Sequence, residues 1–234
     1  MNQLNKELSK MNIGKVLDIA TRDGSFINRL SQNLSGYEEI IGIDISDQGF
    51  AKANEVFASN KKVRFEVMDG RNTLFPDHSF DLVCLSNSLH HIQDIPAVLR
   101  EMKRLKKENG LILINELTAD QQTGAMLTHA LIHHLDCLIN TYHGQYHHVT
   151  YTHEEIKKLL VENGLTTIFA FDEVIDDAPK NAAIKDRVSK VFEKVGQCWE
   201  ALNYDEMCSM AQQIHENYEK YGAAPALQFI SFVQ

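Results

Sequence analysis

Aspartates stand at the ends of three apolar segments in the first third of the chain. Asp18, Asp44 and Asp69 each lie at or just beyond a run of strand length. Three carboxylates in an empty cleft would repel one another, so their grouping suits a ligand that presents hydroxyls, amines or a cationic centre. A phosphate ligand would be repelled. The pattern therefore predicts a small ligand that is neutral or positively charged.

Histidines are concentrated in a second segment, where seven of the chain's eleven lie between positions 129 and 153. On a helix, His129, His133 and Asp136 share one face because they are spaced i, i+4 and i+7. This spacing suits a divalent metal such as zinc, with His147 or His148 completing the shell from the following loop. The alternative is that these histidines line a substrate pocket or a solvated helix face.

Strand-length runs that alternate with helical patterns must position these residues. We expect strands at 15–20, 40–45, 63–68, 80–86 and 111–116, with helical patterns over 26–34, 48–59 and 96–107 between them. This alternation is typical of βαβ units in a doubly wound α/β sheet. Beyond residue 117 we expect a histidine-rich helical stretch over 120–150, a helix over 152–164, a strand over 167–175, a long helical region over 182–221 and a last strand over 226–233.

In an open α/β sheet, ligands bind beyond the carboxyl ends of the strands, near the point where the strand order reverses. The aspartates occupy these positions, and so does the segment Ser86-Asn87-Ser88-Leu89-His90-His91 after the fourth predicted strand. The sequence therefore predicts one site at this edge of the sheet, in a single domain over 1–234.

Composition excludes several classes of function. The 234 residues are 44% hydrophobic and 24% charged, and the formal charge of −9 disfavours a nucleic-acid footprint. No segment approaches the roughly 18 apolar residues that a membrane span needs, and no signal peptide is evident. We expect a cytoplasmic protein with reduced cysteines, no membrane or nucleic-acid partner, and a small molecule or a protein as substrate. A homodimer remains open.

The layout resembles the class I S-adenosylmethionine-dependent methyltransferases. The stretch FPDHSFDLVCLSNSLHHIQDIPAVLREMKRLKKENGLILINEL (75–117) is similar to the small-molecule branch related to quinone-biosynthesis methyltransferases. The resemblance covers about residues 13–117. It implies a seven-stranded, Rossmann-like sheet, mostly parallel with an antiparallel C-terminal strand, with 1–117 as the cofactor-binding core and 118–153 and 180–222 as helical substrate and lid segments.

The resemblance also implies the binding residues for S-adenosylmethionine, whose product form is S-adenosylhomocysteine. Asp18 and the loop through Gly24 would surround the methionine part, Asp44 would accept both ribose hydroxyls, and Ile45 would pack on the adenine. The complete set is Asp18, Ala20, Thr21, Gly24, Asp44, Ile45, Asp69, Gly70 and Asn87. Asp44 follows Asp18 by 26 residues, about the length of a strand, loop, helix and next strand.

The first strand-to-helix turn departs from the family pattern. The family usually has glycine where Ala20 and Arg22 stand, because the backbone approaches the cofactor closely and can adopt positive φ. The Arg22 side chain must therefore leave the cleft or pair with a carboxylate such as that of Asp23. A dinucleotide is disfavoured, because the GxGxxG turn is absent.

Methyl transfer implies in-line attack by an acceptor atom, so the protein mainly aligns the acceptor and removes its proton. His133 or His134 is the candidate for this role, and His90 could place a base near the acceptor, although the His90-His91 pair could instead brace its loop. Because Ser88-Leu89 breaks the Asn-Pro-Pro turn of nucleobase methyltransferases, a small-molecule acceptor is favoured. Two other classes stay open: a non-catalytic cofactor-binding relative, and a metal-dependent enzyme of another kind.

Overall fold

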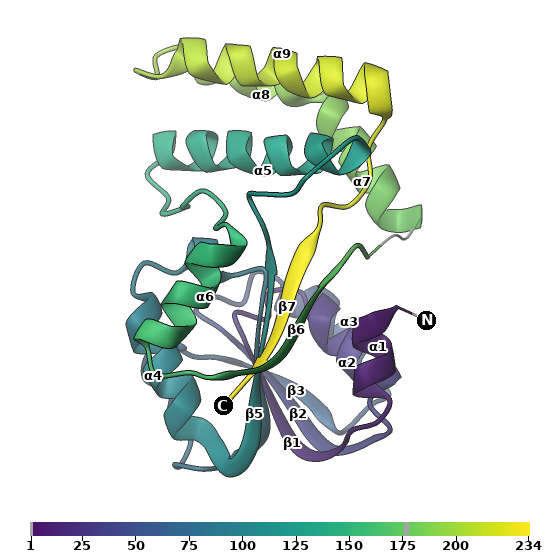
Figure 1. Cartoon of the computed structure of the whole chain (residues 1–234), viewed down its shortest axis with the longest axis vertical. Coiled ribbons are helices and arrows are strands. Elements are labelled where there is room, and N and C mark those ends of the chain that lie inside the picture. The colour runs from purple at the N-terminus through teal and green to yellow at the C-terminus, as the bar shows by residue number, and fades with distance from the viewer. Residues whose placement is uncertain (1, 176–177) are drawn as a thin grey trace.

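A twisted seven-stranded sheet forms the centre of the molecule (Figure 1). The computed structural model describes residues 2–175 and 178–234. The strands are β1 (Asn12–Ile19), β2 (Gly36–Asp44), β3 (Val63–Val67), β4 (Phe80–Ser86), β5 (Lys106–Leu117), β6 (Thr167–Glu173) and β7 (Gln228–Val233). Their order is β3-β2-β1-β4-β5-β7-β6, and β7 is antiparallel to both of its neighbours. The expected doubly wound, mostly parallel sheet is confirmed.

Helices cover both faces of this sheet. On one face lie α1 (Gln3–Leu8) and α2 (Ser25–Asn33), whose apolar side chains pack on Val16, Ile40 and Leu82, and α3 (Phe50–Val56), whose Phe50 packs on Phe65 of β3. The other face carries α4 (Ile95–Leu105) and α6 (His153–Glu162), which pack on Leu17, Ile41 and Val83. Adjacent strand residues point to opposite faces, so strands buried on both sides read as continuous apolar runs.

A third layer of helices lies beyond the carboxyl edge of the sheet, at the top of Figure 1. It consists of α5 (Ala125–Tyr142), α7 (Ala178–Ser189), α8 (Val191–Gly196) and α9 (Tyr204–Tyr221). These helices share a core of their own, which includes Ile132, Leu135, Val191, Met207 and Ile214. We call this layer the helical cover. These helices lie largely within 118–153 and 180–222; the role of these segments as a substrate-binding lid stays a prediction.

Three expected boundaries were wrong. The helical pattern through Lys107 stops at Leu105, because Lys106 already pairs with Phe80 as the start of β5. The helical stretch expected over 120–150 is helical only as α5; Gly144 follows the helix with a φ of 76°, a conformation that stops helices. The long helical region over 182–221 is three helices, of which α8 ends at Gly196. Among the residues described, no helix has the length and hydropathy to cross a membrane.

Candidate active site

The turn after β1 adopts the backbone conformation that glycine favours, although it contains only one glycine. Ala20, Arg22 and Gly24 have φ values of 57°, 48° and 72°. The neighbouring strand fixes this turn, because Thr21 N–H donates to the Ile43 carbonyl at 2.9 Å and Arg22 N–H donates to Asp44 Oδ2 at 2.9 Å. The family's backbone shape is therefore kept by tertiary contacts, without two of the glycines.

The Arg22 side chain is exposed, as expected for a residue that must leave the cleft. It does not use Asp23, whose carboxylate instead pairs with Lys52 at 2.6 Å. The suggested Arg22–Asp23 pair was therefore wrong. Lys52 lies on α3 and reaches the Asp23 carboxylate across the turn.

The side-chain carboxylate of Asp18 is buried and makes no hydrogen bond to the described residues. The residue is 1% exposed, and neither carboxylate oxygen has a hydrogen-bond partner among the described residues. Burial raises the pKa of Asp18 to about 7, and the negative charge of Asp44 raises it further, while the nearby Thr21 hydroxyl acts in the opposite direction. The Thr21 hydroxyl, also buried, does not reach hydrogen-bonding geometry either. Buried polar atoms are normally paired, so these orphaned atoms indicate a ligand.

The next strand end presents a carboxylate beside an uncovered apolar side chain. Asp44 accepts from the backbone N–H groups of Arg22 and Ser46, which orient its carboxylate and leave lone pairs for further donors. Ile45, directly after it, is 71% exposed. This combination suits a ring that packs on Ile45 and hydroxyls that donate to Asp44, as expected from the resemblance.

Three further residues were expected to contact the cofactor: Gly70, Asp69 and Asn87. Gly70 packs against β1, because a Cβ atom there would lie 2.5 Å from Ile19 Cγ2. Asp69 forms an ion pair with Arg71 at 2.6 Å, which lowers the pKa of its carboxyl, so a ligand must share it. Asn87 uses its side chain to accept from Leu117 N–H at 3.1 Å, and it fixes β4 to β5. We call Asp18, Asp44 and Asp69 the acidic side of the edge.

On the other side of the edge, His90 is held by a buried glutamate that the sequence analysis missed. Glu116 in β5 accepts from Ser88 N–H at 3.0 Å, from Leu89 N–H at 2.8 Å and from the His90 ring at Nδ1, 2.7 Å away. His90 is fully buried, and its Nε2 has no partner among the described residues. The sequence feature that could have indicated this role is the single acidic residue, Glu116, within the mostly apolar run LILINEL (111–117).

Two further histidines reach the same place from α5 and from the loop after it. His147 is held by α5, because Cys137 Sγ lies 2.9 Å from its carbonyl oxygen and the Asn140 amide lies 2.8 Å from its Nδ1. The loop is also tied to His90, whose carbonyl accepts from His148 N–H at 2.8 Å. His133 lies on the same helix face as Cys137 and Asn140.

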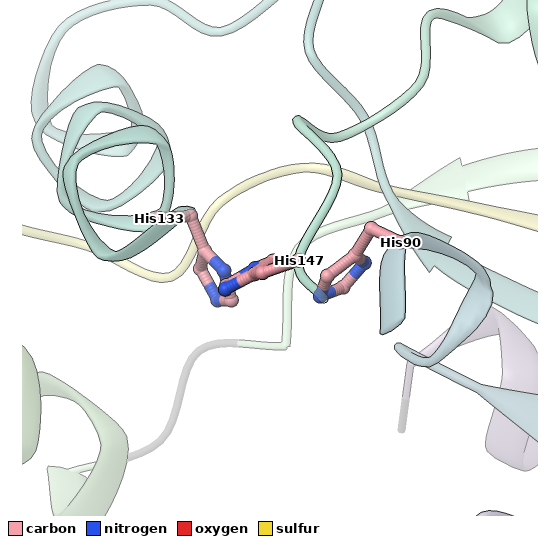
Figure 2. Close-up of side chains that lie close together, drawn as sticks. All are labelled: His90, His133 and His147. Atoms are coloured by element: carbon pink, nitrogen blue, oxygen red, sulfur yellow. The ribbon is translucent and has the colours of Figure 1, made fainter. Parts of the chain in front are cut away.

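Figure 2 shows the rings of His90, His133 and His147 pointing toward one another. One nitrogen from each lies within 4.8 Å of the others. Burial lowers the pKa of His147 to about 4 and that of His133 well below its usual range, and neighbouring histidines add to both effects. We call these three residues with Glu116 the histidine side; the imidazoles of His133 and His147 are neutral at physiological pH.

The structure does not bring the predicted metal ligands together as a set. Asp136 is taken by Arg187 and by Lys194, so it cannot serve as expected beside His129 and His133. His129 accepts at Nδ1 from Ala226 N–H at 2.9 Å. His148 is exposed and stacks on Tyr151. His134 makes no hydrogen bond or ring contact with the residues described, and it follows His133 by about 100° around α5.

The two sides of the edge meet at His91. Its ring lies 4.3 Å, centroid to centroid, from the rings of both His90 and His147. Burial of the ring, these two imidazoles and the Arg22 guanidinium of the acidic side all lower the pKa of His91. His91 therefore packs on the histidine side, and the charge of Arg22 in the turn after β1 acts on it.

Comparison with known proteins agrees with this geometry. Residues 3–168 match the methyltransferase domain family, and the chain belongs to that family. A demethylmenaquinone methyltransferase of Staphylococcus aureus is 30% identical over 102 residues, which cover 44% of this chain and 42% of the relative. The matched region is less than half the length of each of the first curated relatives.

Solved structures share the fold over almost the whole chain. The YcgJ protein from Bacillus subtilis superposes with a TM-score of 0.61 at 18% identity, covering 98% of this chain and 94% of that one. A phosphoethanolamine N-methyltransferase 2 of Haemonchus contortus, in complex with S-adenosylhomocysteine, gives a TM-score of 0.58 at 17% identity, covering 98% of this chain and 52% of that one. The fold is that of the class I S-adenosylmethionine-dependent methyltransferases.

Proposed function

We propose that this protein transfers a methyl group from S-adenosylmethionine to a small-molecule acceptor. The observation that carries the proposal is the unpartnered, buried carboxylate of Asp18 beside a turn with positive φ. A cofactor with an ammonium group supplies the missing donor. The family match and the shared fold support the same reading.

The residues of the acidic side fit this cofactor. Asp18 and Thr21 would hold the methionine part, Asp44 would accept from the ribose hydroxyls, and Ile45 would pack on the adenine, with Asp69 and Gly70 at its edge. When bound, the cofactor supplies an activated methyl group on a sulfonium centre. The protein then has to orient an acceptor and exclude water.

The histidine side suits the acceptor. A neutral imidazole nitrogen with a free lone pair accepts a hydrogen bond from an acceptor hydroxyl, thiol or amine, and Glu116 fixes the orientation of the His90 ring. His133 supplies a second unpartnered nitrogen from α5, which is part of the helical cover. The cover and the loop after α5 would shield the acceptor from water. A cytoplasmic location and a homodimer stay predictions.

A non-catalytic cofactor-binding protein is the second candidate. The observations that favour it are the exposed arginine in the turn after β1 and the Asp69–Arg71 ion pair, both of which differ from an open cofactor pocket. Such a protein would bind the cofactor and form no product.

Calorimetric titration with S-adenosylmethionine and S-adenosylhomocysteine tests the cofactor site. We expect both to bind and Asp44→Ala to weaken binding at least tenfold, since removing a hydrogen bond to a charged group costs about 1.5–3 kcal/mol. Asp47→Ala is the matched control, because Asp47 is an exposed aspartate in the same loop. Absence of binding, or equal binding by Asp44→Ala, contradicts the proposal. A screen of hydroxyl, thiol and amine compounds for S-adenosylhomocysteine formation separates enzyme from binding protein.

A further inference from the structure

Three unpartnered ring nitrogens converge at the histidine side. His90 Nε2, His133 Nδ1 and His147 Nε2 are buried, and none has a hydrogen-bond partner among the residues described. One nitrogen from each ring lies within 4.8 Å of the others, and the rings come from η1 (Leu89–His91), α5 and the following loop (Figure 2). Leaving three buried polar atoms without partners is costly, and one shared ligand satisfies all of them.

The protonation of His90 is fixed by its neighbour in the way that metal sites require. The buried Glu116 carboxylate accepts from Nδ1, so Nδ1 carries the proton and the Nε2 lone pair faces His133 and His147. Metal-binding histidines usually donate their second ring N–H to a carboxylate or carbonyl in this manner. Glu116 is itself oriented by the Ser88 and Leu89 N–H groups.

Asn140 can give His147 the matching tautomer. With the amide nitrogen of Asn140 donating to Nδ1, the lone pair of His147 stays at Nδ1. Turning over the amide places its oxygen there instead; Nδ1 then donates and the lone pair moves to Nε2. Both orientations keep the hydrogen bond, so His147 becomes a ligand without losing a contact.

The nitrogens of the three histidine rings are slightly too far apart to bind one zinc ion without a small movement. Tetrahedral zinc with Zn–N bonds of about 2.0–2.1 Å places ligand nitrogens about 3.4 Å apart, so the rings must approach by roughly 1 Å. The nearby cation is Arg187, and its ion pair with Asp136 offsets its charge. Three imidazoles leave one open position, as in catalytic zinc sites built from three histidines.

We propose that His90, His133 and His147 bind one divalent metal ion, zinc in the first instance, and that its open position takes the hydroxyl or thiol of the acceptor in place of a direct hydrogen bond to these imidazoles. The role in methyl transfer rests on the proposed function; metal binding does not. The metal would promote loss of the acceptor's O–H or S–H proton, which would leave to solvent as the acceptor binds and before the cover excludes water. The freed electron pair then forms the bond to the methyl carbon, and the C–S bond of the cofactor breaks with its electron pair going to sulfur.

Cobalt(II) provides the test, since it replaces zinc in such sites and reports its coordination by visible absorption. The full chain without a histidine tag is stripped with a chelator and titrated with cobalt(II) and then zinc, with no cofactor present. We expect about one equivalent of cobalt(II) to give the strong bands of tetrahedral coordination and zinc to displace it. Addition of 2-mercaptoethanol should add a sulfur-to-metal band if one position is open.

Variants locate the site. His133→Ala and His147→Ala should lower the affinity by more than the ten- to hundredfold that loss of an outer partner costs. His143→Ala is the matched control, because it removes an exposed imidazole next to the same helix and loop. His148→Ala should also have no effect, which separates this site from the set expected from spacing alone. Circular dichroism checks that each variant folds.

Asn140→Asp sharpens the test, because a carboxylate there fixes the proton on His147 Nδ1. We expect it to raise cobalt affinity by about tenfold. Absence of stoichiometric binding by the wild-type chain overturns the proposal, as does unchanged affinity in both His133→Ala and His147→Ala. In that outcome the three rings are a packed cluster only. Failure of cofactor binding in the calorimetric titration would instead remove the proposed function and leave the metal site standing.

Discussion

The acidic side and the histidine side lie on the same edge of the sheet, yet they are built by different means. Asp18 and Asp44 lie at the carboxyl ends of β1 and β2, and Asp69 lies two residues after β3, so strand and turn geometry brings them together. His90, His133, His147 and Glu116 come from four separate segments: the pairing of β4 with β5 joins Glu116 to His90, and the packing of α5 over the edge brings His133 and His147 to them. One side depends on local structure and the other on tertiary packing.

Of the variants considered, Glu116→Ala should have the largest effect, because it removes the carboxylate that organises the histidine side. Glu116→Ala leaves the N–H groups of Ser88 and Leu89 and the His90 ring without their acceptor. We expect a loss of about 3–5 kcal/mol in the free energy of unfolding, measured by denaturant titration. Glu108→Ala, in the exposed start of the same strand, should change it by less than about 0.5 kcal/mol. A loss below about 1 kcal/mol for Glu116→Ala would show that this carboxylate does not organise the loop.

Changing His133 should separate the two sides functionally. His133→Ala removes a nitrogen that faces the acceptor position and touches none of the acidic side. We expect turnover of an acceptor found by the screen to fall about 100-fold, while the Kd for S-adenosylmethionine stays within about twofold. Radiolabelled methyl transfer and calorimetry measure the two quantities, with His143→Ala as control. Equal turnover would remove His133 from the acceptor site.

The acidic side should respond to pH through Asp18. Its carboxyl is protonated in the free protein below its pKa of about 7, and the ionised form pairs best with a cofactor ammonium group. Cofactor affinity should therefore rise by up to about tenfold per pH unit from about pH 5.5 to 7 and then level off. Calorimetry at several pH values checks the slope, and Asp18→Asn should flatten it.

The raised pKa of Asp18 has the opposite effect on the stability of the cofactor-free protein: the free energy of unfolding should fall, not rise, as the pH increases. The ordinary aspartate pKa is 3.8, so the unfolded chain releases this proton at a lower pH than the folded chain. The contribution of Asp18 to folding therefore falls as pH rises from about 4 to about 7. Denaturant unfolding of wild type and Asp18→Asn at both ends of this range should show it. A stability difference that does not change with pH would contradict the raised pKa.

The smallest expected effect concerns the turn after β1. Arg22 adopts a φ of 48°, which costs a side-chain-bearing residue about 1–2 kcal/mol, partly offset by the greater freedom of glycine in the unfolded chain. Arg22→Gly should raise the free energy of unfolding by about 0.5–1 kcal/mol and slightly tighten cofactor binding, because it also removes a positive charge. Gln121→Gly, with a φ of 62° away from the acidic side, should affect stability alone. Loss of stability in Arg22→Gly would show that its side chain holds the turn.

Sequence patterns could predict the sheet and the acidic side because both depend on short-range features. The period of the hydrophobic residues, the lengths of the strands and the spacing of Asp18 and Asp44 are all set within a single βαβ unit. The histidine side was predicted only in part. Helical spacing places His129, His133 and Asp136 on one face, but it cannot show that Asp136 pairs with Arg187 more than 50 residues away. The match between Glu116 and His90 depends on strand register, which the apolar run LILINEL does not reveal.

The position of β7 has a consequence for how the protein is made. β6 pairs in the sheet only with β7, yet α7, α8 and α9 are translated between these two strands. The first five strands form a contiguous block in the sheet, in the order β3-β2-β1-β4-β5. They can therefore pair during synthesis before β7, the strand that pairs with β6, has been made. The acidic side is therefore complete in the growing polypeptide before α5 brings His133 to the edge. The residues proposed to hold the cofactor are therefore synthesised before most of those proposed to hold the acceptor.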